Sequence, residues 1–237
     1  MIRRCRGLLV RCNMRQYIHK RMTTFVPEKR MKLKVCGMKY PDNLTQVVAL
    51  RPDYLGFIFY EPSPRCMADI LVPEDLLALP DSIQRVGVFV NATTDYMLEM
   101  SEMYELDLLQ LHGQETVAQC RALAKQHQRI IKVFSLGADD FDFTSLIPYQ
   151  PYVDFFLFDT QGKQPGGNGV AFDWNQLEQY SGKVPFFLSG GIGLENLPTA
   201  DALSFPHLHA LDVNSRFEVE PGLKDTALLK QLVARVR

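Results

Sequence analysis

Beginning at Lys32, the chain alternates eight times between a short apolar run and a longer amphipathic stretch, and this alternation limits the folds open to it. The apolar runs are rich in Val, Ile, Leu and Phe without strict alternation, which is typical of strands covered on both faces. Strands that alternate with helices pair in parallel through right-handed crossovers. The predicted strands are 32–36, 54–59, 85–90, 108–112, 129–134, 153–158, 185–189 and 209–213.

Residues that favour helix N-termini precede several of the amphipathic stretches. Asp42 or Asn43 is expected to cap a helix over 44–50, and Thr93 or Thr94 is expected to cap the next clear helix. The stretch 139–146 has the faintest helical pattern. Further helices are predicted near 114–124, 174–180, 194–203 and 225–236.

Eight strand–helix units fill residues 31–237 at about 25 residues a unit, which matches a closed (β/α)₈ (TIM) barrel. The alternative is a doubly wound open sheet, which usually has a glycine-rich phosphate turn after its first strand. Here that position reads Cys36-Gly37-Met38, without a G-x-G-x-x-G pattern. No linker or low-complexity segment divides residues 31–237, so the sequence predicts a single α/β barrel domain.

Residues 1–30 differ from the rest in charge, with nine Lys and Arg and one acid, Glu28. Three interpretations are open: an organelle transit peptide, although the segment has no serine; a basic arm for an acidic partner; or upstream sequence outside the folded unit. Met31 lies one residue before the first predicted strand, which favours the third interpretation. In each case we expect a short basic N-terminal extension that is not part of the fold.

The rest of the chain is acidic. Of the chain's 26 basic and 27 acidic residues, 17 and 26 lie in 31–237, and this net charge of −9 argues against nucleic-acid binding. No apolar run reaches the roughly 18 residues of a membrane span. The five cysteines form no CxxC pair, so neither a metal site nor a disulfide framework is indicated. Reduced thiols predict a cytoplasmic protein.

A barrel of this kind brings the C-terminal ends of its strands to one face, where such proteins place their chemistry. A lone cysteine such as Cys36 is more often a small buried hydrophobe. However, the predicted strand ends together hold a thiol, carboxylates, an arginine and a histidine, which is too polar for barrel core. These residues lie at 36, 59–65, 91, 110–112, 159–160, 189–191 and 212–215.

The turns after the last two strands suit a phosphate group. Gly190 and Gly191 follow the seventh strand and leave backbone N–H groups free to bind an anion. After the eighth strand, Asp212 and Ser215 lie in a run that adds amide and hydroxyl donors. Barrels often bind phosphate between these two loops, although ordinary turns also use glycine. We therefore expect a phosphorylated small molecule as the partner.

Asp159 ends an apolar sixth strand, where desolvation would raise its pKa and favour the acid form. The four glycines of 161–170 suggest a mobile cover over the barrel mouth. The sixth strand lies roughly across the barrel from the first, so Cys36 and Asp159 are expected to face each other over one ligand, as base and acid. Capping of the following loop is the alternative role for Asp159.

Arg65 and His112 complete the candidates. Arg65 ends the proline-stiffened run Glu61-Pro62-Ser63-Pro64-Arg65 and can offer a planar fork to a carboxylate, unless it is an ordinary solvated arginine. His112 ends the fourth strand, and a lone histidine in such a place more often supports a site than catalyses there.

Together these motifs resemble those of phosphoribosylanthranilate isomerase, in order from about residue 32 to the C-terminus. The motifs that carry the resemblance are Lys34-Val35-Cys36-Gly37, Gly56-Phe57-Ile58-Phe59-Tyr60 with Ser63 and Arg65, Val86-Gly87-Val88-Phe89-Val90, Gln110-Leu111-His112-Gly113, Asp159, Ser189-Gly190-Gly191, and Asp212-Val213 with Pro221-Gly222-Lys224-Asp225. The resemblance implies a (β/α)₈ barrel of tryptophan biosynthesis, a monomer or homodimer. It also implies an Amadori rearrangement of N-(5-phosphoribosyl)anthranilate to 1-(2-carboxyphenylamino)-1-deoxyribulose 5-phosphate, without metal or organic cofactor.

The resemblance also implies roles. Cys36 matches the general base, Asp159 the general acid, and Arg65 the residue that faces the anthranilate carboxylate. Gly190 and Gly191, with the loops of Asp212 and Ser215, match the substrate-binding and phosphate site. The base must act as thiolate, so we hypothesise that loop N–H groups and helix termini favour the anion.

Two departures stand out: Arg216 occupies a position where the family usually has glycine, and Asn168 one where it has Thr or Ser. Arg216 either adds charge near the phosphate or points away. Two other functions compete. A related indole-forming synthase would need a catalytic lysine at the mouth, for which Lys132 is the only strand candidate. A non-catalytic phosphometabolite sensor would not need both Cys36 and Asp159.

Overall fold

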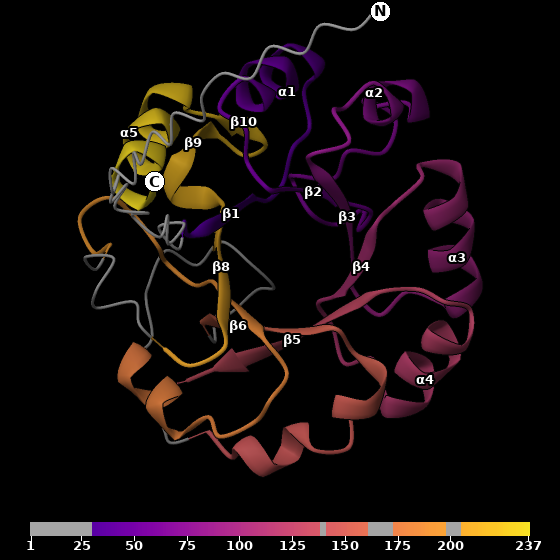
Figure 1. The fold of residues 1–237 in the computed structure, drawn as a ribbon. Coiled ribbons are helices and arrows are strands. Elements are labelled where there is room, and N and C mark those ends of the chain that lie inside the picture. The colour runs from indigo at the N-terminus through magenta and orange to yellow at the C-terminus, as the bar shows by residue number, and fades with distance from the viewer. Residues whose placement is uncertain (1–29, 138–140, 161–172, 198–204) are drawn as a thin grey trace, which may run out of the picture.

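Eight parallel strands close into a barrel in chain order, with β1 hydrogen-bonded to β8 (Figure 1). The computed structural model describes residues 30–137, 141–160, 173–197 and 205–237. Each strand begins and ends within two residues of its predicted bounds, so the predicted (β/α)₈ barrel is confirmed. The strands are β1 Lys32–Val35, β2 Tyr54–Ile58, β3 Gln84–Phe89, β4 Leu108–Leu111, β5 Ile130–Leu136, β6 Phe155–Thr160, β7 Phe186–Leu188 and β8 Leu208–Val213.

Helices and short 3₁₀ turns surround the barrel (Figure 1). The α-helices are α1 Pro41–Val48, α2 Pro73–Leu77, α3 Thr94–Met103, α4 Val117–Lys125 and α5 Thr226–Val236. The 3₁₀ turns are η1 Phe143–Leu146, η2 Gln150–Tyr152, η3 Trp174–Gln179 and η4 Ser215–Phe217. A two-stranded hairpin, β9 Glu218–Glu220 and β10 Leu223–Lys224, separates β8 from α5.

One of the predicted caps is confirmed, and two predictions of helix starts are wrong. Thr93 accepts a hydrogen bond from the Tyr96 amide as predicted, and Asp225 caps α5, a role that the sequence analysis did not assign to it. By contrast, α1 begins at Pro41, which suits the first turn because its missing N–H would have no partner there. The start of α4 is capped by Thr116, not Gln114.

Neither Asp42 nor Asn43 caps α1, because both lie inside the helix. The Asn43 side chain is instead buried, donates to the Lys224 carbonyl at 2.9 Å and accepts from the Lys224 amide at 2.7 Å. It thereby fastens β10 to α1. Helix α2 was missed, since it has only five residues. The predicted helix at 194–203 falls partly outside the described residues, and 194–197 is not helical.

Two apolar layers hold the fold together. Leu33, Val35 and Leu211 point outward and join the layer between barrel and helices. Residues two apart on each strand share a face, so the intervening positions point into the barrel. The lower interior is filled by Tyr54, Val86, Leu108, Ile131, Val133, Phe155, Leu157, Phe187 and Ala210. None of the helices in the described ranges combines the length and apolar character that a membrane crossing requires.

At the barrel end where strands begin, the Tyr54 hydroxyl lies 2.7 Å from His209 Nε2. Burial lowers the pKa of His209 to about 4, and the nearby Lys32 charge adds to the effect. A histidine is expected to titrate near 6.5 in the unfolded chain, so the stability it contributes is present above pH 6.5 and lost as pH falls toward 4.

We therefore expect acid to destabilise the protein between pH 6.5 and 4, by about 1–2 kcal/mol from this residue after allowing for its partial exposure. The variant His209→Gln should flatten that part of the profile. Chemical denaturation at several pH values measures the effect. An identical pH slope in wild type and variant would contradict the assignment.

Candidate active site

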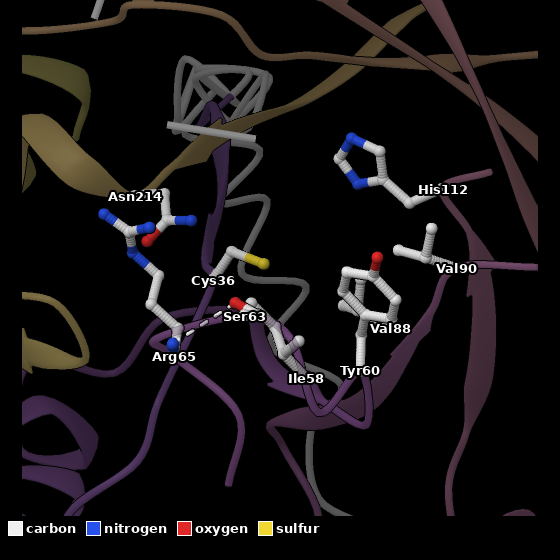
Figure 2. A pocket seen from close by; sticks show the side chains of 9 residues that line it. All are labelled: Cys36, Ile58, Tyr60, Ser63, Arg65, Val88, Val90, His112 and Asn214. Carbon is white, nitrogen blue, oxygen red and sulfur yellow. Dashed lines mark hydrogen bonds between the residues drawn. The ribbon is translucent and has the colours of Figure 1, made fainter. Parts of the chain in front are cut away.

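A pocket opens among the C-terminal ends of β1, β2, β3, β4 and β8. Figure 2 shows the Cys36 sulfur in this pocket, between Arg65 on one side and His112 on the other. The lining residues are Cys36, Ile58, Tyr60, Ser63, Arg65, Val88, Val90, His112 and Asn214. The structure therefore brings three of the predicted site candidates, Cys36, Arg65 and His112, to one cavity.

Cys36 follows β1 and is 5% exposed. A side-chain Cβ at Gly56 on β2 would lie 2.8 Å from Cys36 Sγ, so only glycine there leaves room for the thiol. Burial raises the pKa of the Cys36 thiol, and Asp212 raises it further, while the charges of Lys34 and Lys224 lower it. The net shift is upward. This differs from the hypothesis that the site favours the anion, because burial outweighs the two lysines.

Directly below Cys36, Lys34 Nζ donates to Asp212 Oδ1 at 2.8 Å. The two residues face each other in register across β1 and β8, and both are buried. Burial raises the pKa of Asp212, and the Lys34 charge opposes that rise. Asp212 was predicted to bind substrate. In the structure, one of its carboxylate oxygens accepts the hydrogen bond from Lys34 inside the barrel.

Asp159, at the end of β6, lies beside His112. Its Oδ2 is 3.3 Å from His112 Nε2, and its Oδ1 accepts from the Thr160 amide at 2.9 Å. Gln110 Nε2 lies 3.0 Å from His112 Nδ1. If the Gln110 amide donates there, the imidazole proton sits on Nε2 and points at Asp159. His112 therefore connects Asp159 to the pocket that holds Cys36.

Arg65 is held by a residue that the sequence analysis did not single out. Glu218 on β9 accepts from Arg65 Nε at 3.0 Å and from Arg65 Nη2 at 2.7 Å. Lys224 Nζ donates to Glu218 Oε1 and to Asn214 Oδ1, both at 2.7 Å. Burial would raise the pKa of Glu218, but the bonds from Arg65 and Lys224 lower it below its usual value.

This network fixes the guanidinium at the rim of the pocket, with Nη1 outside the Glu218 bonds. Lys224 belonged to a motif that carried the family resemblance, yet no role was attached to it. The sequence could not indicate that Glu218 binds Arg65, because the two residues are 153 positions apart in the chain.

The two glycines of the predicted phosphate loop after β7 both have left-handed backbone conformations. Gly190 and Gly191 have φ of +89° and +66°, which L side chains rarely adopt. A Cβ at Gly190 would lie 2.2 Å from Thr160 Oγ1, so the loop after β7 packs tightly on the end of β6. Ser215 opens η4 in the loop after β8.

Arg216, the departure from the family pattern, forms an ion pair with Glu195. This pair joins the loops after β7 and β8, and both side chains are at least one-third exposed. The charge of Arg216 is therefore matched by a carboxylate. The glycine-rich stretch 161–170, predicted to cover the mouth, lies outside the described residues.

Lys132 is buried and its ammonium is engaged. It donates to Glu115 Oε2 at 3.0 Å, to the Gly113 carbonyl at 2.8 Å and to the Leu111 carbonyl at 3.2 Å. Three contacts use its three donors. Lys132 therefore anchors the loop after β4, and the geometry does not support the indole-forming synthase, which needs a lysine open to substrate.

No group of three or more His, Cys, Asp or Glu side chains in the described part of the chain is arranged to hold a metal ion. The three cysteines of the described residues, Cys36, Cys66 and Cys120, are free thiols.

Comparison with known proteins gives one consistent family. The model of the family described as N-(5'phosphoribosyl)anthranilate (PRA) isomerase matches residues 33–235. The N-(5'-phosphoribosyl)anthranilate isomerase of Parabacteroides distasonis is 42% identical over 210 residues, which cover 87% of this chain and 93% of that protein. That of Phocaeicola vulgatus is 38% identical, over 87% of this chain and 98% of that protein.

Solved structures agree with the sequence comparison. The phosphoribosyl anthranilate isomerase of Thermotoga maritima is similar with a TM-score of 0.74 and 29% identity, over 87% of this chain and 98% of that one. A phosphoribosyl anthranilate isomerase in complex with reduced 1-(o-carboxyphenylamino)-1-deoxyribulose 5-phosphate has a TM-score of 0.68 and 28% identity, over the same shares. The family match spans residues 33–235, and each of the two relatives covers 87% of the chain. The chain belongs to the N-(5'-phosphoribosyl)anthranilate isomerase family.

Proposed function

We propose that this isomerase carries out the Amadori rearrangement of N-(5-phosphoribosyl)anthranilate with Cys36 as general base and Asp159 as general acid. The observation that carries the proposal is that Cys36 and the His112 partner of Asp159 line one pocket. A thiol that lines a small cavity and a carboxyl group that contacts a histidine of its lining can each exchange a proton with the same sugar. The product is 1-(2-carboxyphenylamino)-1-deoxyribulose 5-phosphate, an intermediate of tryptophan biosynthesis.

The first step is ring opening. Asp159 protonates the ribose ring oxygen, the bond from that oxygen to C1 breaks, and the nitrogen lone pair forms a protonated Schiff base with C1. His112, 3.3 Å from Asp159 Oδ2, holds the carboxyl group in place and stabilises the carboxylate that remains after the transfer.

The second step moves a proton from carbon. The Schiff base withdraws electrons from C2, so the Cys36 thiolate can remove the C2 proton and leave an enolamine. The proton taken up by Cys36 passes to C1, and the C2 hydroxyl proton returns to the Asp159 carboxylate, which gives the ketone and restores both groups. Atoms balance without any oxidant or reductant, because the reaction moves hydrogen within one molecule.

Charged groups of the pocket supply orientation. Arg65, whose Nε and Nη2 bind Glu218, presents its remaining Nη1 edge to the anthranilate carboxylate. The phosphate lies between Gly190-Gly191 and the Ser215 loop, where positive φ angles turn backbone N–H groups toward an anion. In this scheme Asp212 does not contact the substrate but binds Lys34 beneath Cys36.

The unit that performs this chemistry is residues 31–237, and residues 1–30 are an extension outside it. A monomer or homodimer fits the relatives, since one solved structure is of monomers generated from dimeric phosphoribosylanthranilate isomerase of Thermotoga maritima. A reducing compartment such as the cytoplasm suits a base that must stay a free thiol.

The test is an activity measurement on the full chain and on residues 31–237, paired with complementation of a tryptophan auxotroph that lacks this step. We expect both proteins to convert N-(5-phosphoribosyl)anthranilate and to restore growth. A folded full chain that binds the reduced product analogue without turnover would support the sensor alternative and overturn the proposal. Activity of the full chain alone would overturn only the placement of residues 1–30 outside the unit.

A further inference from the structure

A buried ion pair lies directly under the proposed base. Lys34 precedes Cys36 by two residues on β1, so both side chains point to the barrel interior. Lys34 is fully buried, and Asp212 opposite it on β8 is 5% exposed. Their Nζ–Oδ1 distance is 2.8 Å.

Packing does not require this pair. The interior positions nearer the start of the strands, such as Val86, Leu108 and Leu157, are apolar. Removing two charges from water costs several kcal/mol for each ion, and apolar residues of similar size often replace a buried ion pair without loss of stability. A lysine and an aspartate at this level of the barrel therefore point to a functional reason.

The ammonium of Lys34 has three donors, and Asp212 Oδ1 is its one oxygen partner among the described residues. Its positive charge also lowers the pKa of the Cys36 thiol, which lies two residues further along the same face of β1. Asp212 holds the lysine in place and is an anion itself, so it opposes the effect of Lys34 on the thiol. The two members of the pair thus influence Cys36 with opposite sign.

Other charged and titratable groups face Cys36 from the surrounding elements. The charge of Lys224 on β10 also lowers the pKa of the Cys36 thiol, and its ammonium is bound by Glu218 and Asn214. Arg65 and Tyr60 come from the segment after β2, and His112 comes from the end of β4 with Asp159 behind it. Glu218 neutralises part of the Arg65 and Lys224 charge. Lys34 is the cation nearest to Cys36 in sequence, and its charge does most to oppose the rise that burial causes in the thiol pKa.

We propose that Lys34, held beneath Cys36 by Asp212, is a positioning residue that makes loss of the Cys36 proton attainable inside a dry pocket. The inference rests on the proposed role of Cys36 as base. Lys34 does not touch substrate in this scheme. Its ammonium stabilises the thiolate and offsets the penalty that burial places on the anion.

The experiment measures the pH dependence of Cys36 alkylation by iodoacetamide in the full chain, with Lys34→Met and Asp212→Asn. Because an opposite charge close by lowers a pKa by ~1–3 units, Lys34→Met should raise the midpoint by about 1 unit or more. Asp212→Asn should lower it, since the lysine then acts without its counter-ion. Alkylation is followed on Cys36 itself by peptide mass, because Cys66 and Cys120 are also free.

Conservative and combined variants keep the test decisive if a single change disturbs the fold. Lys34→Arg retains the charge and should restore the midpoint to near the wild-type value. The double variant Lys34→Met/Asp212→Asn removes both charges, and its midpoint should lie above that of Asp212→Asn. Thermal unfolding and binding of the reduced product analogue report whether each variant is intact.

A merely structural role would move stability but not the midpoint, or would move both single variants in the same direction. Either result in folded protein overturns the inference. The kcat/KM profile should shift with the alkylation midpoint, with a loss of ~10-fold at pH 8 for each unit of upward shift. Alkylation needs no turnover, so an inactive wild type would instead count against the proposed function.

Discussion

Cys36→Ser is expected to lower kcat by ~10³-fold or more, while the protein still folds and binds the reduced product analogue. Serine has nearly the same size, so the pocket above Gly56 keeps its shape. Its hydroxyl, however, is a far weaker acid than a thiol and supplies almost no anion at neutral pH. Steady-state kinetics and calorimetric binding of the analogue measure the two halves of this prediction.

The matched control is Cys66→Ser, which changes a free, partly exposed cysteine outside the lining of the pocket. It should keep the activity of the wild type. Retention of more than about a tenth of kcat in Cys36→Ser would show that another group removes the proton. An additional loss of analogue binding would instead mark Cys36 as a packing residue.

Asp159→Asn is expected to lower kcat by ~10²- to 10⁴-fold with little change in the affinity for the analogue. Asparagine can still accept the Thr160 amide bond through its oxygen, so the end of β6 stays in place. It cannot deliver a proton to the ribose oxygen, so ring opening becomes the slow step. Kinetics at saturating substrate measure the loss, and Asp95→Asn, an exposed carboxylate in α3, is the control.

Deuterium at C2 of the substrate separates the acid from the base. In Cys36→Ser, removal of the C2 proton is slow, so the variant should show a primary isotope effect on kcat. In Asp159→Asn, ring opening is slow and the effect should disappear. The opposite pattern would exchange the two roles, and equal effects in both variants would contradict a division of labour between them.

The strands and their polar ends could be predicted from the sequence because both depend on local patterns. An apolar run of five residues marks a buried strand, and the barrel then fixes where its last residue lies. Cys36, Arg65 and His112 were placed together on this ground. The cap at Thr93 followed from the same kind of reasoning, since its hydroxyl binds an amide three residues away.

What could not be predicted depends on contacts between distant parts of the chain. Asn43 looked like a cap by its position, but it binds Lys224, 181 residues away. Glu218 holds Arg65 only because a short hairpin after β8 folds back over the pocket. The partnership of Lys34 with Asp212 depends on the register with which β1 closes against β8, and no local pattern contains that register.

The arrangement around Lys132 bears on attempts to evolve new activities from this barrel. Its ammonium is tied to two carbonyls and to Glu115, which in turn binds the amides of Asn91 and Gly113 next to His112. If this lysine were released from these contacts to form an imine, the loop that carries His112 would lose its anchor. His112 would then hold Asp159 less firmly. Directed evolution of an aldolase-like activity would therefore better introduce a new lysine at another position on the rim of the barrel.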